Sequence, residues 1–97
     1  MRNSNEESLS SVIGKLMHDY HLEEGLLEIR IQEAWNVLMD PSILQRTASV
    51  KFEKGELKIR TVSAALAHEL SYQLEDIRAA LNAAIRSEAI LKVKISG

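Results

Sequence analysis

Apolar and polar residues alternate over a short stretch in the middle of the chain. The apolar positions are Val50, Phe52, Leu57 and Ile59, and polar residues separate the members of each pair. Strict alternation is typical of strands with one buried face, and a two-residue connection containing glycine is typical of a hairpin turn. The pattern therefore predicts a hairpin over residues 47–61, with its turn at positions 54 and 55 and with one face that needs a cover.

Two helices are predicted before the hairpin, because apolar residues recur there every three or four positions. Ser8 or Ser10 can cap the first helix, and a short helical turn with Asp40 as its cap and Pro41 at its first position follows the second. The apolar positions are Leu9, Val12, Ile13, Leu16, Met17 and Tyr20 in the first helix and Leu27, Ile31, Ala34, Trp35 and Leu38 in the second, which leaves Glu28, Arg30, Glu33 and Asn36 for solvent.

A single long helix is predicted after the hairpin, with Ser63 as its cap, and a third strand follows it. Leu91, Val93 and Ile95 alternate with polar residues, and a strand joined through a helical crossover runs parallel to the strand before it. The stripe of the long helix comprises Leu66, Leu70, Leu74, Ile77, Leu81, Ala84 and Ile85, and alanines at 64, 65, 67, 79, 80 and 83 widen that face.

These elements predict an α+β fold of order ααββαβ, in which a three-stranded sheet packs on helices. With 97 residues the chain forms one domain over residues 1–97, of which 1–7 are expected to be flexible. The chain has no cysteine, no signal-peptide pattern and no apolar run of membrane-spanning length. A cytoplasmic protein without a membrane contact is therefore expected.

Positive charge is concentrated in the hairpin, although the whole chain has a net charge of −2. Residues 1–45 carry 3 basic and 8 acidic side chains, residues 46–60 carry 5 and 2, and residues 61–97 carry 4 of each. The predicted register places Lys51 opposite Lys58, which costs stability unless Glu53, Glu56 or an anionic partner compensates. With the third strand added, five cations share the polar face of the sheet: Lys51, Lys58, Arg60, Lys92 and Lys94.

This basic face has two interpretations that the residues alone do not separate. An uncovered sheet face must be polar, and lysine is a common guard against edge pairing. The same five cations suit a nucleic-acid surface, whose binding would be weak and salt-sensitive because the chain as a whole is acidic. No aromatic residue lies on that face for bases to stack on, since Phe52 points inward and the other aromatics lie in helices.

No pattern in the chain indicates an active site, a cofactor, a metal or a small-molecule substrate. His18 and His21 lie near Glu23 and Glu24 at a predicted helix end, an arrangement that is far more often plain surface than a metal site. His68 and Glu69 resemble the start of a zinc-peptidase helix, but position 72, where the second histidine would stand, is a tyrosine. The four glycines are too scattered for a phosphate loop, so an enzyme is the least favoured class.

Trp35 and the acidic residues of the first half each have a structural and a functional interpretation. Trp35 falls on the apolar stripe of its helix, which favours a core residue over an exposed partner anchor. The acidic side chains of the first two helices form either a solvated face, which is the simpler interpretation, or a docking surface for a basic partner.

Three segments resemble the DciA family, the bacterial helicase-operator family formerly described as a domain of unknown function. They are the run WNVLMDPSILQRT at 35–47, the hairpin end GELKI at 55–59 and the helix start SAALAHEL at 63–70. Asp40 and Arg46 depart from the family pattern, which usually has glycine and often histidine there. The resemblance covers residues 9–95 and implies a short, single-domain form with a KH-like fold, which works with the replicative helicase in DNA replication without chemistry of its own.

Three hypotheses about function follow. The first is a non-enzymatic replication accessory protein that binds the replicative helicase and possibly DNA, through Lys51, Lys58, Arg60, Lys92 and Lys94. The second is a KH-like RNA-binding or ribosome-associated factor that uses the same face and prefers RNA to DNA. The third is a protein–protein interaction or assembly module whose helices pair with a partner or a second copy.

Overall fold

The structure is a computed structural model that describes residues 22–97. Its sheet contains β1 (Thr47–Glu53), β2 (Glu56–Thr61) and β3 (Lys92–Ser96), with β2 in the centre. β1 is antiparallel to β2, and β3 is parallel to it. The expected α+β class and the parallel third strand are therefore confirmed. The helix predicted over residues 9–20, its cap at Ser8 or Ser10, the flexible start and the pair His18 and His21 lie outside the described residues.

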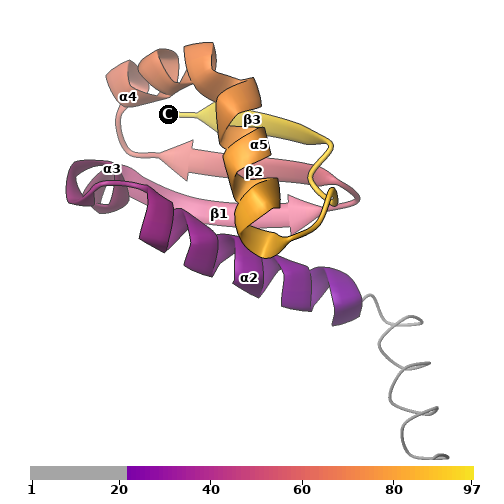
Figure 1. Ribbon diagram of the computed structural model, residues 1–97. Helices are drawn as coiled ribbons and strands as arrows, with labels where there is room; N and C mark the ends of the chain where they lie inside the picture. Colours follow the sequence, from indigo (N-terminus) through magenta and orange to yellow (C-terminus); the bar gives the residue numbers. More distant parts are fainter. Residues whose placement is uncertain (1–21) are drawn as a thin grey trace, which may run out of the picture.

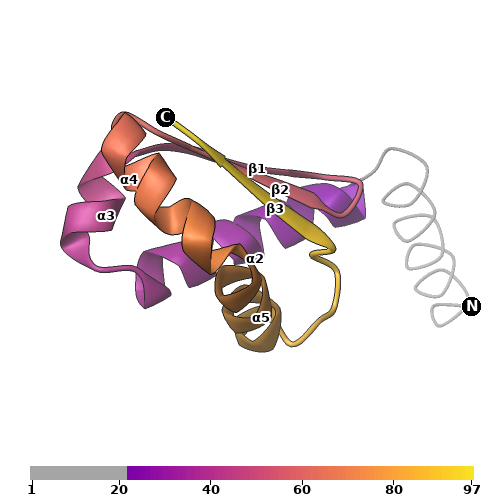
Figure 2. The same ribbon diagram turned by 90° about the horizontal axis from the view of Figure 1, so that it is seen from above.

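Within residues 22–97, the helices cover one face of the sheet and leave the other face open. They are α2 (Leu22–Leu38), α3 (Pro41–Arg46), α4 (Ala64–Leu70), a single 3₁₀ turn η1 (Ser71–Gln73) and α5 (Leu74–Ile85). Figures 1 and 2 show α2, α4 and α5 on the same side of the three strands, so the molecule has two layers. Burial alternates along the strands, and the members of the core on the sheet side are Val50, Phe52, Leu57, Ile59 and Val93.

The hairpin has the register that its turn predicts. Phe52 is paired with Leu57, and Lys51 with Lys58. Lys54 and Gly55 have φ angles of 50° and 79°, the two positive values that a type I′ turn requires. Gly55 also has Leu91 packed on it, since a Cβ added there would lie 2.9 Å from Leu91 Cδ1. Any larger residue at 55 would therefore meet both backbone strain and a steric contact.

The two helix caps predicted within residues 22–97, Asp40 and Ser63, are present. The Asp40 carboxylate accepts a hydrogen bond from the Ile43 backbone N–H at 2.9 Å, and the Ser63 hydroxyl accepts one from the Leu66 N–H at 3.1 Å. Each bond satisfies a donor that the first turn of a helix cannot pair internally. Ile43 is half-buried and packs against the core, as expected for the short helix, and so does Leu44.

Trp35 is a core residue, as its position in the stripe predicts. Its side chain is 1% exposed, and its indole N–H donates to Thr47 Oγ1 at 3.2 Å. The Thr47 hydroxyl in turn donates to the Ile43 carbonyl at 2.8 Å. This short chain of bonds connects α2 with the junction of α3 and β1. Trp35 therefore sets where the first strand begins relative to the helix that covers it.

The prediction of one long helix after the hairpin is wrong. The helix breaks into α4 and α5 at η1, where Gln73 leaves the helical region with φ −121° and ψ 17°. The Ser71 hydroxyl donates to the His68 carbonyl, a local bond with which serine competes against regular helix. The bend turns α5 across the sheet, as Figure 1 shows. Ala84 is exposed rather than part of the apolar stripe, and among the six alanines expected to widen that face only Ala67 is buried.

The prediction that Leu91 lies on the core face is also wrong. Leu91 is 73% exposed, and Ile90 is fully buried in its place. The cause is Asn82, a buried residue of α5 whose side-chain amide donates to the Ile90 carbonyl and accepts from the Ile90 N–H, both at 3.0 Å. This pair of bonds turns Ile90 inward before the strand begins at Lys92.

The second helix differs from its predicted pattern at two positions. Leu38, expected in the core, is 46% exposed. Glu28, expected in solvent, is half-buried and accepts a hydrogen bond from the Phe52 backbone N–H at 2.8 Å. Periodicity along one helix cannot show such a contact, because it depends on which strand edge lies beside the helix.

Candidate nucleic-acid interface

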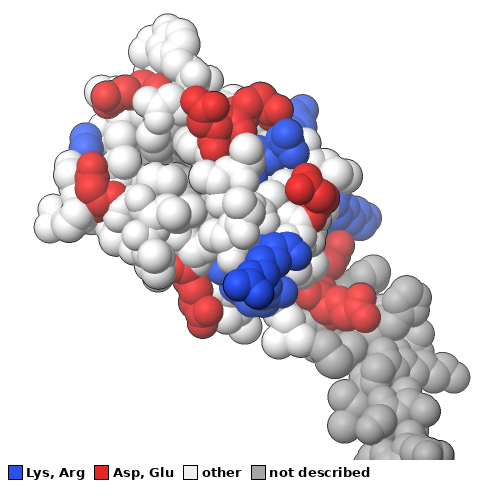
Figure 3. Space-filling view, viewed as in Figure 1, with Lys and Arg blue, Asp and Glu red and all other residues white. Residues whose placement is uncertain are grey.

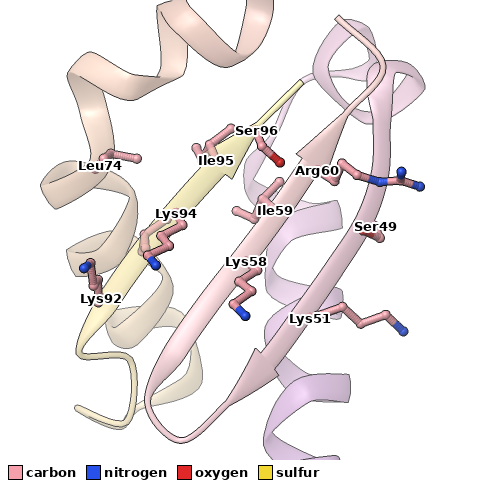
Figure 4. A pocket seen from close by; sticks show the side chains of 11 residues that line it. Ser49, Lys51, Lys58, Ile59, Arg60, Leu74, Lys92, Lys94, Ile95 and Ser96 are labelled. Carbon is pink, nitrogen blue, oxygen red and sulfur yellow. The ribbon is translucent and has the colours of Figure 1, made fainter. Parts of the chain in front are cut away.

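All five cations singled out in the sequence lie on the open face of the sheet. Lys51 comes from β1, Lys58 and Arg60 from β2, and Lys92 and Lys94 from β3, and each is exposed. Figure 4 shows their side chains around one surface, and Figure 2 shows the helices of residues 22–97 on the opposite side of the strands. We call these five residues the basic face. Alternation brings them together, because every second residue of a strand points to the same side.

Three lysines form a row across the sheet. The register pairs Lys51 with Lys58 across β1 and β2, and Lys58 with Lys94 across β2 and β3. Like charges in such positions repel one another and destabilise the sheet. The row is therefore a local concentration of positive charge that a neighbouring anion would stabilise.

Glu56 supplies part of the compensation. Its carboxylate lies 3.7 Å from Lys58 Nζ and 3.5 Å from Lys94 Nζ. Of the two glutamates that the sequence suggested for this task, Glu56 performs it, and within residues 22–97 Glu53 makes no ion pair. Both lysines remain more than half exposed, so each pair contributes only about 0–1 kcal/mol. The carboxylate offsets the row without neutralising it.

A shallow depression of about 630 Å³ follows the basic face across the sheet. All five cations line it, together with Ser49 and Ser96, which flank Arg60 on the neighbouring strands, and Leu74 from the first turn of α5. The apolar strand residues Ile59, Val93 and Ile95 complete the lining. The sequence did not indicate Leu74, because the spacing assigned it to the buried stripe of one continuous helix. Since no aromatic side chain of residues 22–97 lines the depression, the arrangement suits phosphate groups better than stacked bases.

The helix side of the molecule has a different charge pattern. Figure 3 shows positive and negative side chains interspersed there around a broad uncharged area. One ion pair on α5 joins Arg78 Nε to Glu75 Oε2 at 3.0 Å. The hydrogen bond from Arg78 and its charge lower the pKa of Glu75, and the same contact raises the pKa of Arg78. Positive charge is therefore gathered on the open sheet face, not on the helices.

The described part of the chain holds no arrangement of side chains typical of metal chemistry. Within residues 22–97 no group of three or more histidine, cysteine, aspartate or glutamate side chains is placed to hold a metal ion. His68, at the start of the incomplete zinc-peptidase pattern, has Tyr72 as its neighbour, with 3.1 Å between the phenol oxygen and Nε2. Among the described helices none has the length and apolar character needed to cross a bilayer.

The fold and the site define a small α+β domain with an open, basic sheet face. A family model described as "Dna[CI] antecedent, DciA" matches residues 8–95, and the chain belongs to this family. Searches among curated proteins and among solved structures found no match. Membership gives the chain a role in bacterial DNA replication and helicase loading.

Proposed function

We propose that this domain is a non-enzymatic replication accessory protein of the bacterial cytoplasm, which binds the replicative helicase and holds nucleic acid on its basic face. The helicase part rests on the family. The nucleic-acid part rests on one observation, namely that five cations from three strands line a single depression that no helix of the described residues covers. The KH-like fold that the resemblance implies is part of the same proposal.

Contacts with phosphate groups supply most of the affinity for nucleic acid at this face. Lysine and arginine recognise the backbone charge without reading sequence, and each neutralised phosphate releases counterions. With three to five phosphates contacted, the logarithm of the affinity for single strands should fall against the logarithm of salt with a slope of about −2 to −3.5. We expect affinity to depend little on base sequence, because the depression lacks aromatic platforms.

Reversing charge at the centre of the basic face tests the proposal. We expect Lys58→Glu combined with Arg60→Glu to weaken binding of single-stranded DNA by at least about tenfold, because attraction to phosphate becomes repulsion. Fluorescence anisotropy of labelled DNA and of matched RNA, titrated with salt, with and without the replicative helicase, measures this.

The control is Arg86→Glu, which reverses one charge at the C-cap of α5 in the helix layer. Its effect on DNA binding is compared with the effect of the single variant Lys58→Glu. Unchanged binding by the folded double variant would overturn the placement on this face. Helicase-enhanced binding supports the replication role. A strong preference for RNA without a helicase effect would favour an RNA-binding factor, and no binding under any condition would favour an assembly module.

Glu56 offers a test with the opposite sign. Glu56→Gln removes the carboxylate that lies near Lys58 and Lys94, and both lysines then become fully available to phosphates. We expect DNA affinity to rise about two- to fivefold and the salt slope to steepen. Glu53→Gln, which removes a charge from the same face without breaking an ion pair, should have the smaller effect. Equal effects of the two variants would show that only net charge matters.

A further inference from the structure

The two edges of the sheet differ in the hydrogen bonding of their outward backbone groups. Along the β1 edge, three side chains of α2 bind backbone groups that point outward, two in the strand and one in the turn that follows it. Glu28 accepts from the Phe52 N–H at 2.8 Å, and Gln32 donates to the Val50 carbonyl at 2.9 Å. Glu24 accepts from the N–H of Lys54 at 3.0 Å. A spacing of four residues places these three side chains on one face of α2. This face lies along β1, so the edge is closed to another strand.

In the described part of the chain no strand pairs with the outer edge of β3. One backbone bond shows which groups of β3 point outward. The Lys92 N–H donates to the Gly55 carbonyl at 3.2 Å, so the backbone of Lys92 faces β2. In a parallel ladder alternate residues face the same neighbour, and the N–H and C=O groups of Val93 and Ile95 therefore point away from the sheet. Within residues 22–97 no side chain or other segment forms a hydrogen bond with these four groups.

The surroundings of this edge set the chemistry of a strand added there. On the open face the added strand would lie beside Lys92 and Lys94, both exposed. On the other face it would lie over α5, whose half-buried Leu74 lies next to β3 and contributes to the lining of the depression as well. Because side chains alternate between the two faces, a matching strand alternates acidic residues with apolar ones.

We propose that the outer edge of β3 binds an extended segment of a partner protein in which acidic and apolar residues alternate. Backbone pairing with Val93 and Ile95 supplies affinity, and carboxylates beside Lys92 and Lys94 supply specificity, the usual division in strand addition. A second copy of this chain is disfavoured, because pairing two β3 strands would bring lysines against lysines.

This inference is independent of the nucleic-acid proposal, although the two ligands share Lys92 and Lys94. Lysine on an edge strand normally discourages pairing with unsuitable chains, and here it selects an acidic one. A bound acidic strand would also occupy two of the five cations of the basic face. We therefore expect the peptide and DNA to compete.

Labelled peptides of about nine residues test the proposal without nucleic acid or helicase, so that its failure would leave the proposed function untouched. One peptide alternates glutamate with valine, and a second contains the same residues in two blocks. Anisotropy should show binding of the alternating peptide at least about tenfold tighter. Lys92→Glu with Lys94→Glu should weaken it at least about tenfold, whereas Lys51→Glu, at the far strand of the same face, should change it less than about twofold.

Amide hydrogen exchange gives the decisive readout. In the free protein the amides of Lys94 and Ser96, which face β2, should already exchange slowly, and those of Val93 and Ile95 should exchange fast. The alternating peptide should slow Val93 and Ile95 at least about tenfold. Equal binding of the two peptides, or binding without protection of these two amides, would overturn the proposal and leave only electrostatic attraction.

Discussion

Replacing Trp35 by alanine is expected to lower the free energy of unfolding by about 3–5 kcal/mol, a large share of what a domain of this size has. The side chain is 1% exposed at the centre of the core, and its indole N–H is bonded to Thr47. The alanine variant loses the buried area, leaves a cavity and removes that bond. Urea unfolding followed by circular dichroism measures the loss, since Trp35 is the only tryptophan available for fluorescence.

Two further variants separate the contribution of the hydrogen bond from that of the buried ring and provide an exposed control. Trp35→Phe keeps an aromatic ring but removes the N–H donor, so we expect a smaller loss than for alanine, with about 0.5–1.5 kcal/mol of it from the bond to Thr47. Val37→Ala on the same helix, at a position 82% exposed, should change stability by less than about 0.5 kcal/mol. A loss below about 1 kcal/mol for Trp35→Ala would contradict the role assigned to this residue.

Asn82→Leu should destabilise the domain by about 2–4 kcal/mol, because it leaves the buried N–H of Ile90 without a partner and its C=O with only the long bond from Arg78 at 3.5 Å. In the structure the amide of Asn82 bonds both the N–H and the C=O of Ile90, as a neighbouring strand would. The exchange rate of the Ile90 amide should rise in the variant. Asn36→Leu, the same substitution at an exposed position of α2, serves as the control and should stay within about 0.5 kcal/mol.

The Asn82→Leu variant is also expected to affect the basic face. Asn82 sets the position of the chain just before β3, which supplies Lys92 and Lys94. Loss of its bonds should therefore weaken DNA binding under conditions in which the domain remains folded. If the Asn82→Leu variant were as stable as the original protein, with an unchanged exchange rate of the Ile90 amide, other contacts would hold the segment before β3.

The hairpin and the basic face could be predicted because local rules determine them. A two-residue turn fixes the register, and the register fixes which side chains share a face. The parallel third strand followed from chain connectivity. Lys51, Lys58 and Lys94 therefore lie in one row, as the register in the structure shows. Their role in binding stays a prediction.

Other features could not be read from the sequence, because each depends on a contact between distant segments. The stripe of Leu66, Leu70 and Leu74 continues with helical spacing through the bend at η1, so periodicity alone could not reveal it. The inward turn of Ile90 depends on a buried amide eight residues earlier. The role of Glu28 depends on the strand edge beside it, 24 residues further along the chain.

The closed edge of β1 has a consequence for how copies of the domain can associate. A sheet that accepts strands on both sides can grow from molecule to molecule without end, as fibrils do. Here α2 occupies the backbone groups of one side through Glu24, Glu28 and Gln32. Strands can therefore join this sheet only at β3, and the sheet ends at β1. The domain can therefore terminate a shared sheet, but it cannot propagate one into a polymer.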